Sequence, residues 1–537
     1  MFVSFHSSFV AQSTMEPSYI MTVINLVFRS SHFTFFAISA LLLLAWRLFA
    51  FTILPFLYPR DPKEYPYWIP IVGHLQSFFK NSNDLLSEAR LYFRDTREPF
   101  ALTVAGRKWY ILTKSEDVTS TYKIDNGSLS YDIFAIEVMR MLGVSEEGIG
   151  KAFQTHDTTK DRSNNVQYKH LVRLCKEYQL EQLSPGDRLS QLVGPIIELL
   201  ELRMNINWID SRRWYVSVND RDCRIVSLYQ WLSDVFIGLG TTAYFGKSLE
   251  EVDPDLTRTF MSFESLSWQA MYQYPSFLCG KMLKAKLKLQ NAIAVYFKLP
   301  KDKRNDASWF IGQIEREIDR LEIASTDKAI FFFQLFWSIN GNTRKAPFWI
   351  LSYLIFDPTI LELVRSETEP AFGGKGVDVV YLLDVQKCPR LNGIWEETIR
   401  LTAFAASVRF LTCDMELGGR TLRKGNRLMM PQRQLHFSKQ AFGENAAMFD
   451  PDRFIKNPSL RRNTSLRPFG GGTTMCPGRN LAKQMTLAFI AIALHRFEIS
   501  LDPPDQAFPA PAEGKPSIGL IDVQDGCDIQ VKIRVRS

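Results

Sequence analysis

Residues 467–497 read RPFGGGTTMCPGRNLAKQMTLAFIAIALHRF, and this stretch decides the fold. The consecutive glycines at 470–472 allow backbone conformations closed to other residues and let the backbone approach a flat ligand closely. Pro477 suits the first turn of a helix, and the apolar residues beyond Leu481 predict that this helix continues. Cys476 is therefore expected at a helix N-terminus, where unpaired N–H groups and the positive dipole end favour a thiolate.

A thiolate in such a place is the kind of ligand that holds haem iron and pushes electron density towards bound oxygen. Two other interpretations exist for a cysteine in a glycine-rich loop. A phosphate-binding loop would end in Gly-Lys-Ser or Gly-Lys-Thr, and this loop does not. A buried structural cysteine is common, but it does not explain this order of phenylalanine, glycines, cysteine, proline and glycine before a helix. The stretch therefore predicts a haem-thiolate site with Cys476 as the metal ligand.

The stretch resembles the cysteine loop of the cytochrome P-450 superfamily, whose pattern is Phe, two residues, Gly, three residues, Cys, one residue, Gly. Phe469, Gly472, Cys476 and Gly478 fill these positions. The resemblance implies a haem cofactor, iron protoporphyrin IX with an axial thiolate, bound by these four residues. Family members usually place Arg or His two residues before the cysteine to hold a haem propionate, and this chain has Thr474 there.

A further cofactor contact follows from the resemblance alone. Arg409, in ASVRF, lies where family members place a basic residue against a haem propionate. The alternative for Arg409 is a solvated strand residue. The W-x-x-x-R helix that commonly supplies another propionate contact does not occur in the sequence between residues 120 and 180. Arg409 is therefore the cation that we assign to the cofactor.

The family also carries an E-x-x-R pair on a helix, locked to a later arginine. Glu397 and Arg400, in WEETIR, have the i, i+3 spacing that lets a carboxylate meet a guanidinium. Arg453, in FDPDRF, lies between this pair and Cys476, in the family's order. We therefore predict a buried Arg–Glu–Arg cluster that shapes the cysteine loop. The spacing alone would not select this pair, because it recurs at Glu137/Arg140, Glu317/Arg320 and Glu362/Arg365.

Residues 329–358 read AIFFFQLFWSINGNTRKAPFWILSYLIFDP, which predicts a long apolar helix interrupted by a polar patch and by Pro347. Polar side chains and Gly341 inside an apolar helix favour a local widening, which is common at functional sites. One alternative is a second membrane span, which would place Arg344 and Lys345 in lipid at a high cost. The other is a core helix with a proline kink.

The resemblance implies that this helix crosses the oxygen side of the haem. Family members usually have an acid followed by a threonine there, and the two assist proton delivery to bound oxygen. Thr343 matches the threonine and Asn342 replaces the acid, so we assign both as catalytic residues. An amide cannot carry a proton as a carboxyl group does. With the cysteine loop, this pattern is similar to the branch that contains sterol 7-alpha-hydroxylase-type enzymes and prostacyclin synthase, with their fungal relatives.

Residues 33–58 read FTFFAISALLLLAWRLFAFTILPFLY and are apolar except for Arg47. A helix needs about 20 apolar residues to cross a bilayer core, so this run predicts a transmembrane anchor. Arg47 is a cost that falls if its stem snorkels towards an interface. A cleaved signal peptide is disfavoured because no short apolar region precedes a small-residue cleavage site. A buried core helix is the remaining alternative.

The chain then divides into an N-terminal extension (1–32), the anchor (33–58) and a catalytic domain (59–537), with Met1 or Met15 as the start. Helical patterning dominates and strand-like alternation is sparse. We predict a mainly α protein with small β-sheets, a single large cytochrome P-450-type fold preceded by the transmembrane helix. Basic residues are scattered at a net charge of +7, so we expect no nucleic-acid partner. The 7 cysteines form no C-x-x-C pair, which argues against a disulfide framework and a zinc site.

The function implied by the resemblance is a monooxygenase. Such an enzyme inserts oxygen from O2 into a lipophilic small molecule, with electrons from an NADPH-dependent reductase. We expect a terpenoid, steroid-like or polyketide substrate of secondary metabolism, and a single-pass location in the endoplasmic reticulum with the catalytic domain in the cytosol. The alternative is a haem-thiolate isomerase or dehydratase that acts on a peroxide without external electrons, as prostacyclin-type members do.

Overall fold

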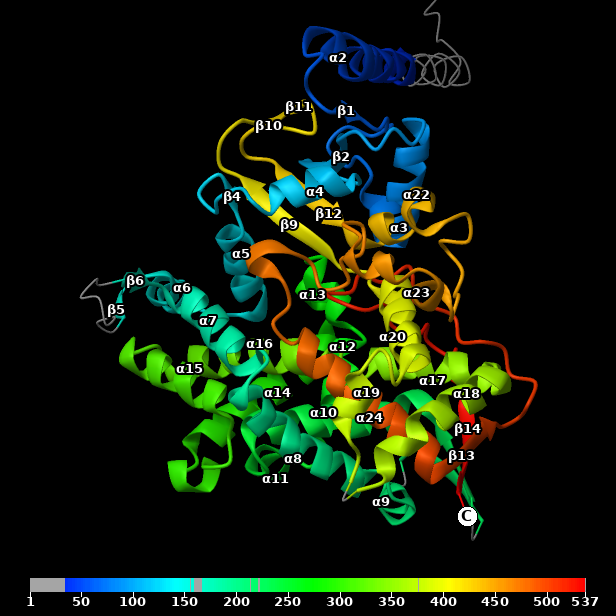
Figure 1. Ribbon diagram of the computed structural model, residues 1–537. Coiled ribbons are helices and arrows are strands. Elements are labelled where there is room, and N and C mark those ends of the chain that lie inside the picture. Colours follow the sequence, from blue (N-terminus) through cyan, green and yellow to red (C-terminus); the bar gives the residue numbers. More distant parts are fainter. Residues whose placement is uncertain are drawn as a thin grey trace, which may run out of the picture.

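The computed structural model describes residues 34–154, 156–158, 167–212, 214–220, 223–374 and 376–536. The expected extension 1–32, with both candidate start sites, lies outside the described residues. The first described element is an exposed apolar helix, Thr34–Leu57, with a mean hydropathy of 2.1. It coincides with the predicted anchor, and we call it the anchor helix. Its last turns are a wider π-helical segment, η1 (Phe49–Ile53), and α2 (Leu54–Leu57). Figure 1 shows it at one end of the molecule, beside β1.

The strands gather mainly into two small sheets among the described residues. A mixed sheet has the order β1-β2-β3-β12-β9-β4, and Figure 1 shows it between the anchor helix and the helical body. A second sheet has the order β13-β14-β8-β7, and β10–β11 and β5–β6 are separate hairpin-like pairs. The bounds are β1 Lys63–Glu64, β2 Phe100–Val104, β3 Arg107–Ile111, β4 Leu129–Ser130, β5 His156–Thr158, β6 Gln167–Lys169, β7 Val216–Asp220, β8 Cys223–Ser227, β9 Ala406–Leu411, β10 Met415–Leu417, β11 Arg420–Leu422, β12 Arg427–Pro431, β13 Phe497–Leu501 and β14 Gln530–Val535.

Helices make up most of the remaining body. Seven that contribute to the core are α8 Asp187–Arg203, α10 Leu228–Phe245, α14 Gly280–Lys298, α16 Ser325–Asn340, α17 Lys345–Phe356, α20 Pro389–Thr402 and α24 Arg479–Arg496. The others are α3 Leu75–Tyr92, α4 Ser115–Thr121, α5 Asp132–Leu142, α6 Glu146–Phe153, α7 Leu171–Leu183, α9 Ile206–Ser211, α11 Ser248–Val252, α12 Leu256–Glu264, α13 Ser267–Met271, α15 Trp309–Arg320, α18 Pro358–Thr368, α19 Val379–Leu383, α21 Gln432–His436, α22 Lys439–Phe442 and α23 Arg453–Lys456. Short 3₁₀ turns are η2 Ser276–Leu278, η3 Lys301–Arg304, η4 Glu369–Phe372, η5 Pro458–Arg462 and η6 Gly472–Thr474.

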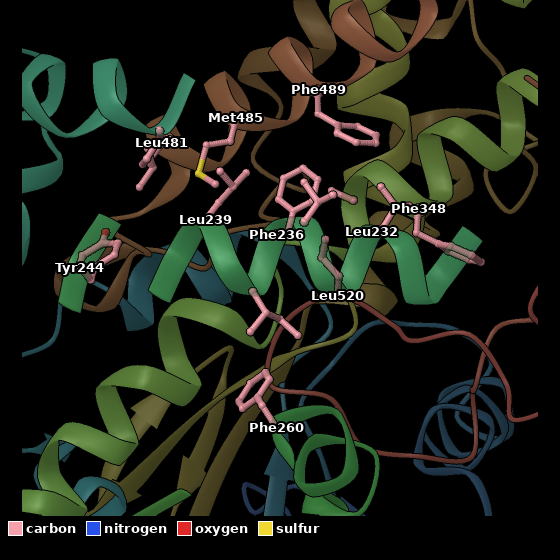
Figure 2. Close-up of a cluster of buried hydrophobic side chains, with 14 of the residues drawn as sticks. Leu232, Phe236, Leu239, Tyr244, Phe260, Phe348, Leu481, Met485, Phe489 and Leu520 are labelled. Atoms are coloured by element: carbon pink, nitrogen blue, oxygen red, sulfur yellow. The ribbon is translucent and has the colours of Figure 1, made fainter. Parts of the chain in front are cut away.

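The centre of the core is formed by α10 and α24, both buried over most of their length. Figure 2 shows apolar side chains of the two helices pointing toward one another, with Phe348 of α17 and Phe260 of α12 beside them. The rings of Phe236 and Phe489 meet edge to face with centroids 5.2 Å apart. A helix that is apolar nearly all round must be buried. The packing therefore fixes α24, and with it the loop that precedes α24.

The long apolar helix predicted over 329–358 is broken, as its polar patch indicated. It forms α16 and α17, separated by a four-residue turn at 341–344. Pro347 lies in the first turn of α17, where its missing N–H costs little. Both halves are packed in the protein core, so the alternative of a second membrane span is not supported by their burial. The turn at the break packs against α10 and α12, where Arg344 bonds to Tyr229 and Glu264.

Candidate active site

The cysteine loop, residues 467–478, is a tight turn held by its own backbone. The N–H of Cys476 donates to the carbonyl of Phe469 over 2.9 Å, and the N–H of Met475 donates to that of Gly472 over 3.2 Å. Gly472 has φ +58°, and a Cβ there would lie 2.9 Å from the Cβ of Tyr122. Glycine is therefore required at 472 both by conformation and by the packing of Tyr122. The loop brings three of the predicted residues, Phe469, Gly472 and Cys476, together.

The thiol of Cys476 lies just ahead of α24, whose N-cap is Gly478, the fourth predicted residue. The residue keeps accessible surface, although many protein atoms surround the sulfur. Burial raises the pKa of this thiol, while the backbone N–H of Gly478 and the cations of Lys176 and Arg479 oppose that rise. These are the groups that would stabilise a thiolate once a metal ion displaces the proton.

Lys176 is a site residue that the sequence did not reveal. It lies on α7, and its Nζ donates to the carbonyl of Met475 over 2.5 Å. The cation is thereby held one residue from Cys476, and burial lowers its pKa. No local motif marks Lys176, because α7 has no W-x-x-x-R spacing and only tertiary packing brings this helix to the cysteine loop.

Arg409 on β9 is buried, with only 7% of its surface exposed. Its Nη2 donates to Oγ1 of Thr474 over 2.5 Å, its Nη1 donates to the carbonyl of Val408, and its guanidinium lies 5.2 Å from the ring centre of Tyr131. Among the residues that the structure describes, no carboxylate pairs with Arg409, and burial lowers its pKa. A buried cation without a counter-charge is costly. An anionic group bound beside the cysteine loop would remove that cost.

The donor set around the cysteine loop fits a haem group. The thiol of Cys476 would provide a ligand for iron, and the glycines at 471 and 472 make room for the side chain of Tyr122 beside the loop. The buried guanidinium of Arg409, which meets no carboxylate among the described residues, would provide a partner for a propionate. It is bonded to Thr474, which replaces the family's usual basic residue. Thr474 departs from the family pattern because it carries no positive charge. Arg409 brings a positive charge to this position of the loop through its bond to Thr474.

The predicted Arg–Glu–Arg cluster is present and fully buried, which confirms the prediction. Arg400 Nη2 and Nε donate to the Glu397 carboxylate over 2.7 and 2.8 Å, and Arg453 Nε donates to it over 3.0 Å. Glu397 and Arg400 have exposed fractions of 0%. Arg400 also donates to the carbonyl of His436, and the N–H of Arg467 donates to Nε2 of the same histidine over 2.9 Å. His436 therefore links the cluster to the first residue of the cysteine loop.

The His436 imidazole gives a pH dependence. Burial and the cation of Arg400 lower its pKa to about 3, whereas the unfolded value is near 6.5. The unfolded chain therefore binds a proton below pH 6.5 that the folded chain does not. We expect this histidine to lower the free energy of unfolding by about 1.4 kcal/mol per pH unit as the pH falls from 6.5 towards 4. Urea unfolding at pH 7, 6 and 5 measures it, and a His436→Gln variant with the same slope as the unmodified chain would contradict it.

Asn342 and Thr343, the two residues predicted as catalytic, lie in the turn between α16 and α17. Their side chains have different partners. Oδ1 of Asn342 accepts the N–H of Leu520 over 3.0 Å, so this side chain fastens a C-terminal loop. The hydroxyl of Thr343 is half-buried, and its one contact among the described residues is a 3.5 Å approach to the carbonyl of Asn340, the last residue of α16. Thr343 therefore keeps a hydroxyl able to bond elsewhere, while Asn342 is committed to a tertiary contact.

Arg344 and Lys345, which follow the turn, belong to a buried charge cluster with Glu264 and Asp522. Arg344 pairs with Glu264 over 2.7 Å, and Lys345 pairs with Glu264 over 2.8 Å and with Asp522 over 3.3 Å. The two cations lower the pKa of Asp522 to about 2. The cluster joins α12, the helix break and the C-terminal loop, and it borders a cavity of about 280 Å³. These carboxylates explain why two cations are tolerated between the apolar helices α16 and α17.

This site geometry is that of a haem-thiolate class of protein: a cysteine in a glycine-rich loop directly before a long buried helix, with the cations of Lys176 and Arg409 beside it. The cytochrome P450 family model matches residues 226–522, so the chain belongs to the cytochrome P450 family. It is an enzyme of the monooxygenase type, and it binds haem as the family does, through a cysteine thiolate.

Curated relatives agree with this family and with the predicted branch. The cytochrome P450 monooxygenase calL of Penicillium decumbens is 24% identical over 475 residues, which cover 79% of this chain and 84% of that protein. The 7-alpha-hydroxycholest-4-en-3-one 12-alpha-hydroxylase of Homo sapiens is 23% identical over 484 residues, 84% of this chain and 89% of that protein. Prostacyclin synthase of Bos taurus is 28% identical over 222 residues, 37% of this chain and 44% of that protein.

A solved structure confirms the predicted fold class. The retinoic acid-bound cyanobacterial CYP120A1 aligns with a TM-score of 0.64 and 16% identity, and the alignment covers 89% of this chain and 99% of that one. Among the described helices, Thr34–Leu57 is long and apolar enough to cross a membrane. This agrees with the expected membrane anchor.

Proposed function

We propose that Cys476 is the residue that holds the haem iron, and that the enzyme hydroxylates or otherwise oxidises a lipophilic small molecule with O2 and electrons from an NADPH-dependent reductase. The observation that carries the proposal is the position of the Cys476 thiol, ahead of α24 and beside the N–H of Gly478. Bound haem supplies the oxygen chemistry. The protein supplies the ligand, the orientation and the charges around it.

The chain's own residues have separate roles in this proposal. Phe469, Gly472 and Gly478 shape the loop around the thiolate, and Lys176 adds a positive charge next to it. Arg409 holds a propionate. The hydroxyl of Thr343 relays a proton on the oxygen side, because among the described residues it has no contact beyond the carbonyl of Asn340 at the end of α16. Asn342 lies next to Thr343 in the same turn, and its bond to Leu520 fastens this turn to the C-terminal loop.

The substrate and the setting follow from the relatives and from the anchor helix. One relative is named for a steroid substrate, and several are fungal monooxygenases. We propose a terpenoid, steroid-like or polyketide substrate of secondary metabolism. An anchor in the endoplasmic reticulum, with the catalytic domain in the cytosol, would place the enzyme beside both membrane-dissolved substrates and the reductase.

Replacing Arg409 by leucine is expected to weaken haem retention about ten- to hundredfold. The variant loses a charge-assisted hydrogen bond, which is worth about 1.5–3 kcal/mol. The rate of haem transfer to an excess of apomyoglobin measures the effect without any turnover. Arg107→Leu, at an exposed arginine of the same sheet, is the control. Equal haem loss from the two variants would show that Arg409 does not hold the cofactor.

Oxygen uptake tests the reaction type. With a reductase and NADPH, the enzyme is expected to consume oxygen and form a hydroxylated product from a panel of terpenoids, steroids and polyketides, and to do neither when the reductase is omitted. A second candidate, a peroxide isomerase or dehydratase, is favoured by one observation: Asn342 replaces the family's usual acid, and its oxygen is already bonded to Leu520. Rapid conversion of a lipid endoperoxide with no electron donor, and no oxygen uptake with the reductase, would favour that candidate.

A further inference from the structure

The anchor helix carries a charge near its middle, and that charge has a fixed partner. Arg47 Nη1 donates to the carbonyl of Tyr67 over 2.6 Å, and its guanidinium lies 4.0 Å from the ring centre of Trp68. The ring of Tyr67 lies 5.4 Å from that of Trp46 and 5.2 Å from that of Phe51. The chain after the helix therefore folds back along the last turns of the helix. Figure 1 shows the helix lying across the sheet end of the molecule instead of pointing away from it.

The partner segment cannot lie in hydrocarbon. Residues 65–70 have no regular secondary structure, and Pro66 and Pro70 interrupt them. Irregular backbone exposed to lipid does not occur in the hydrocarbon region, because its polar groups would lack partners. Since Arg47 is bonded to this segment, the end of its side chain must lie at or outside the boundary of the hydrocarbon core. An arginine near the bilayer centre would also be expensive in itself.

The length of helix beyond Arg47 sets how much of the helix can lie inside the hydrocarbon core. Arg47 is ten residues before Leu57, the end of the helix, which is a distance of about 15 Å at 1.5 Å per residue. That is about half of a hydrocarbon core of about 30 Å. The turns at 48–57 would then lie outside the core, and residues 34–46 would supply about 20 Å of helix inside it.

The side chains around Arg47 suit the headgroup layer. Trp46, Tyr67 and Trp68 surround it, and tryptophan and tyrosine are enriched at membrane–water interfaces. The neighbouring apolar side chains are exposed: 81% for Phe56 and 76% for Ile71. They continue the exposed apolar surface of the anchor helix.

We propose that Arg47, rather than the end of the helix, marks the boundary of the hydrocarbon core on the side of the catalytic domain. Residues 48–57 and 65–72 then form one aromatic and apolar platform that lies in the lipid headgroup layer. The platform holds the sheet end of the enzyme against the bilayer. This inference rests on the membrane attachment proposed above, and it is independent of the reaction.

Site-resolved labelling tests the boundary on the full chain with haem in phosphatidylcholine vesicles. Leu44→Cys, Ile53→Cys and Phe56→Cys are treated with a water-soluble maleimide, and each modified peptide is quantified by mass spectrometry, so that the native cysteines do not interfere. We expect labelling at positions 53 and 56 to be at least tenfold faster than at position 44. Equal protection at 44 and 53 would overturn the proposal, because the helix would then cross the core over its whole length.

A second pair of variants tests the role of Arg47 itself. Arg47→Leu, combined with Ile53→Cys, is expected to slow labelling at position 53 several-fold, because the helix can then enter the core further. Arg60→Leu, at an arginine 81% exposed beyond the helix, is the matched control and is expected to leave labelling unchanged. An unchanged rate in the Arg47→Leu variant would contradict the assignment. An unaltered haem spectrum in the same samples separates these outcomes from any failure of the proposed reaction.

Discussion

The Cys476→Ser variant is expected to fold but to lose the thiolate-ligated haem and all monooxygenase activity. A serine hydroxyl stays protonated and is a poor ligand for haem iron, whereas a thiolate donates the charge that activates oxygen. The bonds from the N–H of Cys476 to Phe469 and from the N–H of Met475 to Gly472 do not use the sulfur, so the fold around Phe469 and Gly472 should persist. Haem content, the Soret band of the purified variant and product formation with a reductase are the measurements.

Cys413→Ser is the matched control for this substitution. Cys413 is an exposed cysteine between β9 and β10. Its replacement is expected to leave the Soret band, the haem content and the product yield unchanged. Our assignment of Cys476 would be wrong if the two serine variants behaved alike.

Glu397→Gln is expected to lower the free energy of unfolding by about 3–5 kcal/mol and to reduce the yield of haem-loaded protein severely. The carboxylate neutralises Arg400 and Arg453, and the three groups are buried together. A neutral amide would leave two guanidinium groups in the core without a counter-charge, which costs far more than the pair contributes. Since Arg400 also holds His436, the strain would reach the start of the cysteine loop. Chemical unfolding and the ratio of haem to protein measure both effects.

The control is another pair with the same spacing. Glu362 and Arg365 also lie three residues apart on a helix, but the Glu362 side chain is 61% exposed. Glu362→Gln is expected to change the free energy of unfolding by less than about 1 kcal/mol, as is usual for exposed pairs. Similar losses in the two variants would mean that burial of Glu397 does not matter.

The same comparison shows what the sequence could predict. The E-x-x-R spacing occurs in several places, and order along the chain selected Glu397, Arg400 and Arg453. The Glu397 cluster differs in energy from the other E-x-x-R pairs because it is buried. Its burial depends on the packing of α20 in the core, which cannot be predicted from the local sequence. Arg140 instead pairs with Glu146, outside the predicted spacing. The cysteine loop was predictable because its chemistry requires particular residue types at fixed distances.

The turn between α16 and α17 shows which features could not be predicted from the sequence. The polar patch predicted the break between α16 and α17, but not the partner of each side chain. Asn342 meets Leu520 across 178 residues, a contact set by the path of the C-terminal loop. Lys176 was missed for the same reason, since α7 reaches the cysteine loop only through tertiary packing. Contacts between distant segments, rather than local periodicity, complete the site.

The reduced carbon-monoxide difference spectrum of the purified, unmodified enzyme tests the central claim most directly. A haem iron held by a deprotonated sulfur gives a strongly red-shifted Soret band in this state, and we expect that band in the unmodified enzyme and its absence in Cys476→Ser. A colourless folded protein, or a red-shifted band that survives in the serine variant, would contradict the account.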